Sequence, residues 1–416
     1  MYIKLGPTSP KYTTPTTDKN FNPIQNKSTP QNNVTDTIMA NTNYTPPGRL
    51  GDSNMNVTTD PRTHPKISEL LKAMGMADMI TEYPEPTTWS VESLTPYFAA
   101  SDAAMTSLYN NIDNELPADA DEPEIETTTQ TIKGVDNNDI ILYIYRPKSA
   151  QGPLPAVIYS HGGGMVSIAT NTKTHRRWIH SLALQGVVAI MPDFRNAYTA
   201  AAHNPFPAGL NDCAAAVQHI AANRASLGIS SIVLQGESGG GNLAIATTLK
   251  AKREGWLDAI AGVYATVPYI SGAYGWSRER KLAELPSLVE NDGYLLSMKH
   301  TAGSAWFYGP GEIDNEGGGT NPHAWPYHSS IEDLKGLPPF VVEMNELDPL
   351  RDEGMAFYRK LARAGVRVEA KVSLGVTHAS ALIFRKALPE VHEAAVRDVV
   401  GFAKSLGGGV GEKGRL

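Results

Sequence analysis

Short apolar runs alternate with longer amphipathic stretches along the central part of the chain. The apolar runs are bounded by glycine or proline and have the length of buried strands: Ala156–Ser160, Val187–Phe194, Ile232–Gln235, Ala259–Val267 and Phe340–Asn345. The stretches between them have helical spacing: 172–185, 208–226, 241–254 and 352–364. This alternation predicts an α/β fold, with a mostly parallel central sheet flanked by helices. Since ligands of such sheets bind beside the carboxyl ends of the strands, we expect the functional residues in the loops there.

The segments before this central part carry other patterns. Amphipathic helical spacing extends over 64–80 and over 90–112, and the second stretch begins at Ser90, a residue type that caps helices well. Strands with alternating polarity follow at 127–134 and 139–147, separated by a hairpin-type turn. We therefore expect two helices and a hairpin before the alternating region.

Both ends of the chain lack a pattern that could form a core. Residues 1–60 are rich in Asn, Thr and Pro without apolar periodicity, so we expect a disordered tail. An amphipathic helix at 389–406 is followed by a glycine-rich end, 407–416, which we expect to be flexible. Between the ends, 270–330 interrupts the rhythm and is rich in aromatic residues. Two interpretations stay open: this insertion forms a lid or substrate pocket, or its aromatic residues pack the insertion itself.

Composition narrows the possible partners. The net charge is −7 with scattered lysine and arginine, which argues against a nucleic-acid partner. The single Cys213 cannot form an intramolecular disulfide and is predicted to be a buried core residue. No apolar run reaches the about 18 residues of a membrane span, and no signal-peptide core is present, so we expect a cytoplasmic protein. The C-terminal Gly414-Arg415-Leu416 loosely resembles a peroxisomal address, which is the alternative location.

The segment 232–246, IVLQGESGGGNLAIA, has the pattern of a nucleophile elbow. In this pattern a serine, here Ser238, lies on a sharp turn between a strand and a helix. Gly236 and Gly240 lack the Cβ that would collide at the turn. The pentapeptide alone is a weak signal in a chain with 37 glycines, so the interpretation depends on finding the partners of the serine.

A glycine run after the first central strand supplies a candidate oxyanion hole. His161 is followed by three glycines, which are costly for stability and so indicate a close approach of the backbone to a ligand. We predict that the N–H groups of Gly162, Gly163 and Gly239 stabilise an oxyanion, and that His161 positions the loop through hydrogen bonds.

Chain order selects the base from the 11 histidines. In α/β-hydrolases the serine is followed by the acid and then by the histidine, which leaves His378 and His392. His392 lies within the helical pattern of 389–406, whereas His378 follows the predicted strand 367–373 in a loop. We therefore predict that His378 is the base.

The acid is expected in the loop after the strand Phe340–Asn345. Asp348 precedes a proline, which keeps it out of helical geometry. Asp352 and Glu353 fall in the first turn of the next helix, where carboxylates suit the helix dipole. We predict that Asp348 orients His378, with Glu346 or Asp352 as the alternative.

Several of these segments together resemble the hormone-sensitive-lipase-like group of α/β-hydrolases. The matching motifs are HGGG at 161–164, GESGG at 236–240, DPLRDEG at 348–354 and GVTH at 375–378. The similarity extends over about 60–405. It implies a carboxylesterase with an α/β-hydrolase domain at 126–406, and a helical cap over the serine built from N-terminal helices within 61–125 and the insertion at 270–330. The chain departs from the common GDSAG motif of the group at Glu237 and Gly239, and from its Tyr-Arg-Leu-Ala-Pro motif at Asn196-Ala197.

We therefore predict a serine carboxylesterase that acts through the triad of Ser238, His378 and Asp348 and an acyl-enzyme. The partners expected are small-molecule carboxylic esters or lactones, bulky and apolar, such as secondary metabolites. No cofactor or metal is expected, because the sequence has no HExxH motif, no paired cysteines and no phosphate-cradling loop. An amidase or deacetylase using the same triad, or a non-catalytic ligand receptor, is the alternative.

Overall fold

A computed structural model of the chain describes residues 45–76, 89–115, 124–314, 317 and 319–406. Its centre is an eight-stranded sheet in the order β1-β2-β4-β3-β5-β6-β7-β8. The strands are β1 (Ile125–Lys133), β2 (Asp139–Pro147), β3 (Leu154–Ser160), β4 (Val188–Pro192), β5 (Ile229–Glu237), β6 (Gly262–Thr266), β7 (Phe340–Asn345) and β8 (Val368–Ser373). β2 pairs antiparallel with β1 and β4, and all other neighbours are parallel. The predicted mostly parallel sheet is confirmed.

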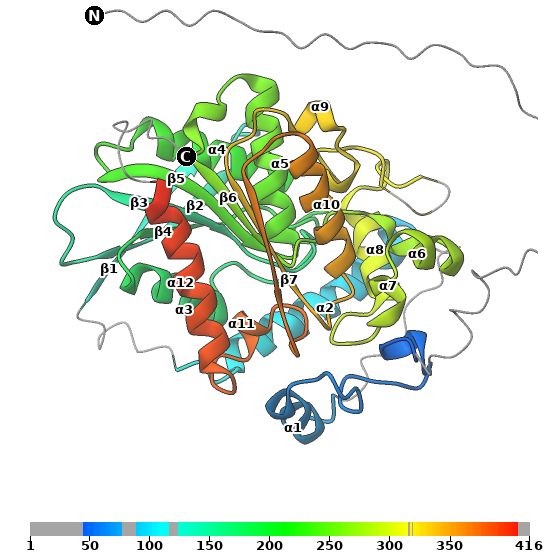
Figure 1. Ribbon diagram of the computed structural model, residues 1–416. Helices are drawn as coiled ribbons and strands as arrows, with labels where there is room; N and C mark the ends of the chain where they lie inside the picture. Colours follow the sequence, from blue (N-terminus) through cyan, green and yellow to red (C-terminus); the bar gives the residue numbers. More distant parts are fainter. Residues whose placement is uncertain (1–44, 77–88, 116–123, 315–316, 318, 407–416) are drawn as a thin grey trace, which may run out of the picture. The chain divides into compact units, whose positions relative to one another are not determined.

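Helices cover both faces of this sheet. On one face lie α3 (Lys173–Leu184) and α12 (Pro389–Leu406), and on the other lie α4 (Ala208–Ala222), α5 (Gly239–Glu254) and α10 (Arg351–Arg363) (Figure 1). Successive residues of β3 alternate between the two layers: Val157 belongs to the apolar cluster with α3 and α12, and Ile158 to the cluster with α4, α5 and α10. The burial of β3 on both faces explains why its sequence is a continuous apolar run.

A second group of helices lies beside the carboxyl ends of the strands. It consists of α2 (Val91–Asn111), α6 (Arg278–Glu284), α7 (Ser287–Glu290), α8 (Met298–Tyr308) and α11 (Ser380–Ile383). The short α9 (Ile331–Leu334) instead precedes β7 and packs near the amino end of that strand. α2 begins after Ser90, which forms the predicted cap as part of a capping box with Ser93. In the described ranges no helix is both long and apolar enough to cross a lipid bilayer.

The aromatic residues of 270–330 mostly pack against one another. Tyr274, Trp276 and Trp325 are buried in a cluster that also contains Phe98 of α2. The rings of Tyr269 and Tyr274 stack with centroids 4.5 Å apart. The second of the two open interpretations therefore holds for these buried residues: they form the core of the insertion.

The N-terminal prediction of disorder is wrong for residues 46–60. This stretch contains a 3₁₀ helix at Gly48–Leu50, and Val57 is 1% exposed within an apolar cluster that includes Ile67 of α1 (Pro65–Ala73). Its order comes from single buried residues and from ion pairs with distant segments, neither of which produces periodicity in the sequence. The rest of the predicted tail, 1–44, and the C-terminal end, 407–416, lie outside the described residues.

α1 is shorter than the predicted helix over 64–80. It ends at Ala73. Gly75 follows with a φ of 68°, and a right-handed α-helix cannot continue through this left-handed conformation. The last part of the prediction, 77–80, lies outside the described residues.

Candidate active site

Ser238 lies at the sharp turn between β5 and α5. Its φ of 56° and ψ of −121° are strained for a residue with a side chain, and such strain is common at functional sites. A Cβ on Gly236 would come within 2.3 Å of the carbonyl carbon of Gly240. A Cβ on Gly240 would come within 1.8 Å of the Ser160 carbonyl oxygen. Glycine is therefore required at both flanking positions for the steric reason that the sequence indicated.

His378 and Asp348 meet in the loops that follow β8 and β7. The His378 Nδ1 atom lies 2.8 Å from Asp348 Oδ2. A carboxylate can only accept, so Nδ1 carries the proton and Nε2 is left as a base. Burial opposes protonation of His378, but the adjacent Asp348 carboxylate, together with Glu237 and Glu353, raises the pKa of the imidazole above its ordinary value. This arrangement suits a residue that takes up a proton during a reaction.

The other acids considered from the sequence have different partners. Glu346 accepts a hydrogen bond from the Gly375 N–H at 2.8 Å, and Asp352 accepts one from the Ser287 N–H at 2.7 Å. Glu353 is buried and accepts from the Ser271 hydroxyl at 2.6 Å. The contact with His378 is made by Asp348.

His392 is engaged away from the serine. On α12, its two ring nitrogens lie 2.8 Å from the Ala381 carbonyl oxygen and 3.0 Å from the Ser181 hydroxyl. Burial lowers the pKa of His392 to about 4. Its surroundings therefore fit a structural role within the helix packing.

The glycine loop differs from the prediction at its first position. The Gly162 N–H donates to Glu237 Oε1 at 2.7 Å, so this N–H is not available to an oxyanion and the prediction for Gly162 is corrected. Gly163 and Gly164 have φ values of 99° and 64°. Within the described part of the chain, their N–H groups and that of Gly239 donate no hydrogen bond. Sequence reasoning missed Gly164, although it belongs to the same glycine run.

His161 holds this loop in the predicted way. Its Nδ1 lies 2.7 Å from the Gly162 carbonyl oxygen and its Nε2 lies 3.0 Å from the Thr170 hydroxyl. The loop also contacts the elbow, because a Cβ on Gly239 would lie 2.9 Å from the Gly164 nitrogen. Two glycine-rich segments that are distant in sequence thus bring their free N–H groups together.

Glu237 is a second residue that the sequence did not identify as functional. It is 4% exposed, and burial raises its pKa to about 7 although the hydrogen bond from Gly162 opposes the rise. Its charge also contributes to the raised pKa of His378. The sequence signals were its position directly before Ser238 and its departure from the common GDSAG motif. Glu237 links the glycine loop to the elbow by its hydrogen bond.

Ser238 and His378 line one cavity of about 400 Å³. Its walls come from the glycine loop, from α2 through Tyr97 and Met105, and from α8 through His300. A second cavity of about 400 Å³, mostly apolar, adjoins it. The two cavities share four lining residues: Met105, Tyr109, Leu295 and Ile383. The serine therefore lines a cavity that shares a wall with a mostly apolar one.

Cys213 is buried as predicted, and burial raises the pKa of its thiol to about 12. Its sulfur lies 3.7 Å from the Ser160 hydroxyl. Among the described residues, no group of three or more His, Cys, Asp or Glu side chains is arranged to hold a metal ion.

Comparisons with known proteins connect this site to esterases. The family described as alpha/beta hydrolase fold matches residues 157–382. The chain is similar to the solved structure of brefeldin A esterase, a bacterial homologue of human hormone sensitive lipase, with 50% identity, a TM-score of 0.83, and coverage of 88% of this chain and 99% of that one. Esterase Est22 is 34% identical with a TM-score of 0.73, over 85% of this chain and 99% of that one. Esterase LipI of Mycobacterium tuberculosis is 28% identical over 331 residues, 78% of this chain and 96% of its own.

Proposed function

Because the chain belongs to the α/β-hydrolase family, in its hormone-sensitive-lipase-like group, we propose that it is a serine carboxylesterase with Ser238 as its nucleophile. The assignment of the chain to the carboxylic ester hydrolases follows from its sequence and structural similarity to known esterases. The roles of individual residues are the proposal. The observation that carries it is the contact of 2.8 Å between His378 and Asp348 beside the cavity that Ser238 lines.

The reaction begins with attack of the Ser238 hydroxyl oxygen on the ester carbonyl carbon. His378 Nε2 accepts the hydroxyl proton, and Asp348 stabilises the resulting imidazolium. The negative charge that develops on the carbonyl oxygen is stabilised by three N–H groups, those of Gly163, Gly164 and Gly239. His378 then donates the proton to the departing alcohol, which leaves an acyl group on Ser238. Water, activated by His378, attacks this acyl-enzyme and releases the carboxylic acid.

The substrates proposed are bulky or long apolar esters, including lactones. The adjoining cavity supports this choice, because its walls include Leu70, Leu108 and Phe384 and it shares four lining residues with the serine cavity. The segments expected to form the cap also help to shape the substrate site, since residues of α2 and α8 line the serine cavity. An apolar acyl or alcohol group would gain about 0.8 kcal/mol for each methylene buried there.

An ester is expected to react much faster than the matching amide. The anion of an amine is a poorer leaving group than an alkoxide, so the nitrogen must receive a proton from His378 before it can depart as a neutral amine. The test compares the p-nitrophenyl ester and the p-nitroanilide of one acid. Equal rates would assign the chain as an amidase, and no turnover of either compound would contradict the proposed function.

Filling the adjoining cavity with a larger side chain is expected to restrict the enzyme to esters with shorter acyl chains. Leu108 lines this cavity and not the serine cavity, so Leu108→Trp should lower kcat/KM for p-nitrophenyl octanoate about tenfold while changing that for the acetate less than about twofold. Ala103→Trp is the matched control, because Ala103 is exposed on the same helix and lines neither cavity. Unchanged octanoate hydrolysis in folded Leu108→Trp would show that substrates do not use this cavity.

A further inference from the structure

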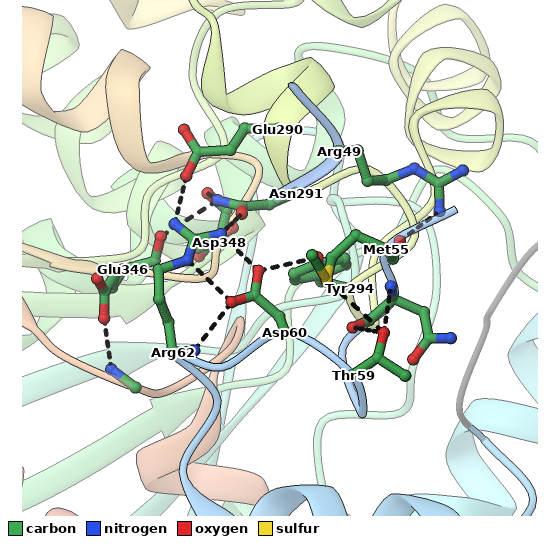
Figure 2. Close-up of polar contacts among 12 residues, drawn as sticks. Arg49, Met55, Thr59, Asp60, Arg62, Glu290, Asn291, Tyr294, Glu346 and Asp348 are labelled. Atoms are coloured by element: carbon green, nitrogen blue, oxygen red, sulfur yellow. Dashed lines mark hydrogen bonds and ion pairs between the residues drawn. The ribbon is translucent and has the colours of Figure 1, made fainter. Parts of the chain in front are cut away.

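The N-terminal strap, defined here as residues 46–64, contacts the loop that carries Asp348. The Arg62 guanidinium lies 3.3 Å from the Asn291 side-chain oxygen. Asn291 in turn donates from its Nδ2 to the backbone oxygens of Glu346, at 3.1 Å, and of Asp348, at 3.2 Å (Figure 2). Arg62 is thus one side chain away from the backbone of the proposed catalytic acid.

An ion-pair cluster anchors the strap at this point. Arg62 pairs with Asp60 at 2.7 Å and also with Glu290 (Figure 2). Arg351 pairs with Glu290 at 2.8 Å and donates to the Glu346 carbonyl oxygen at 3.0 Å. The Asp60 and Glu290 side chains are 1% and 4% exposed, so their charges depend on these arginines for compensation. The need to compensate these buried charges therefore fixes the positions of the side chains in the cluster.

The strap also contacts the loop that carries His378. The His64 N–H donates to the Gly375 carbonyl oxygen at 2.8 Å. The Gly375 N–H donates to the Glu346 side chain at 2.8 Å. One end of the strap therefore joins the acid loop and the histidine loop.

Apolar packing connects the same three segments. Val57 of the strap lies in a buried cluster with Leu347 and Val376. Leu347 directly precedes Asp348, and Val376 lies two residues before His378. The Leu347 N–H donates to the Val376 carbonyl oxygen at 3.1 Å. Both loops are thus packed against the strap close to their triad residues.

We propose that the strap is a positioning element of the triad: Arg62, through Asn291 and Glu290, holds the Asp348 loop against the His378 loop. This inference rests on the proposed roles of Asp348 and His378. None of the strap residues in the contacts above lines the serine cavity. Because a misplacement of about 1 Å can cost about 100-fold in rate, loosening the strap should reduce catalysis more than substrate binding.

Arg62→Met is expected to lower kcat about 10- to 100-fold with KM changed less than about threefold. It should also lower the pKa of His378, because a displaced Asp348 stabilises the imidazolium less. The charged groups around His378 are Asp348, Glu237 and Glu353. Loss of the Arg62 charge acting through space alone would raise the pKa of His378, so the sign of the shift separates positioning from simple electrostatics.

The measurements are steady-state kinetics, thermal unfolding, and titration of His378 by NMR. Lys66→Met is the matched control, because it removes a cation near the strap whose ion pair with Glu390 is more than half exposed. Arg62→Lys retains a charge beside Asp60 without the planar fork, and should show a smaller change of the same sign. If Arg62→Met does not fold, the kcat of Arg62→Lys and the pKa of His378 in that variant decide instead.

Wild-type kcat and a wild-type pKa of His378 in the folded variant would overturn the proposal. A lowered kcat and a lowered pKa of His378, with Lys66→Met unchanged, would support it. If the wild-type chain hydrolysed no ester, the proposed function would fail, whereas the NMR titration would still test the strap. The two failures are therefore distinguishable.

Discussion

Ser238→Ala is expected to lower kcat for ester hydrolysis by about 10⁴- to 10⁶-fold, because it removes the atom that attacks the carbonyl. The fold should be retained, since serine in the wild type and alanine in the variant place side chains of similar size on the same strained backbone. Circular dichroism and the midpoint of thermal unfolding check the fold, and initial rates with a short p-nitrophenyl ester check the activity.

Ser304→Ala is a matched control for the loss of a hydroxyl. Ser304 lines the same cavity, and its hydroxyl donates to the His300 carbonyl oxygen within α8. Its removal should change kcat by only a few fold. Activity of Ser238→Ala close to that of the wild type would show that another group attacks the ester.

Asp348→Asn is expected to lower kcat by about 10³- to 10⁴-fold, because an amide neither stabilises the imidazolium nor enforces the correct tautomer of His378. Two nearby acids provide controls of the same chemical type. Glu346→Gln and Asp352→Asn should retain most of the activity, because these side chains bond to the Gly375 and Ser287 N–H groups and not to His378. A larger loss in either control than in Asp348→Asn would reassign the acid.

The residual activity of Asp348→Asn should also extend to lower pH. His378 acts as a base only when it is neutral, so activity falls as pH decreases through its pKa. Asp348 raises this pKa, although burial opposes the rise, and removal of the carboxylate therefore lowers it. The acidic limb of the kcat/KM profile should move toward lower pH. A shift in the opposite direction would contradict the assigned contact.

The strands, and the residues proposed for the triad, could be inferred from patterns that the sequence itself carries. β7 was predicted with its observed bounds, since a continuous apolar run bounded by turns predicts a buried parallel strand. His378 and Asp348 followed from chain order and from their positions in loops after strands. These inferences needed no knowledge of side-chain contacts.

The corrected parts depend on contacts between residues that are distant in sequence. The Gly162 N–H is occupied because the Glu237 side chain turns toward it across 75 positions of the chain, which no local pattern shows. The strap is ordered because Arg62 pairs with Glu290, 228 positions away. A polar segment can therefore have a fixed structure when its charges are compensated by another part of the molecule.

Covalent labelling with diethyl p-nitrophenyl phosphate, followed by peptide mass spectrometry, tests directly whether Ser238 is the nucleophile. Because the phosphorus is attacked by an activated serine and the phosphoryl-enzyme is not readily hydrolysed, we expect one diethylphosphoryl group per chain. It should be located on Ser238, and activity should disappear in proportion to labelling. Labelling of another residue, or full ester turnover after Ser238 has been labelled, would show that Ser238 is not the nucleophile.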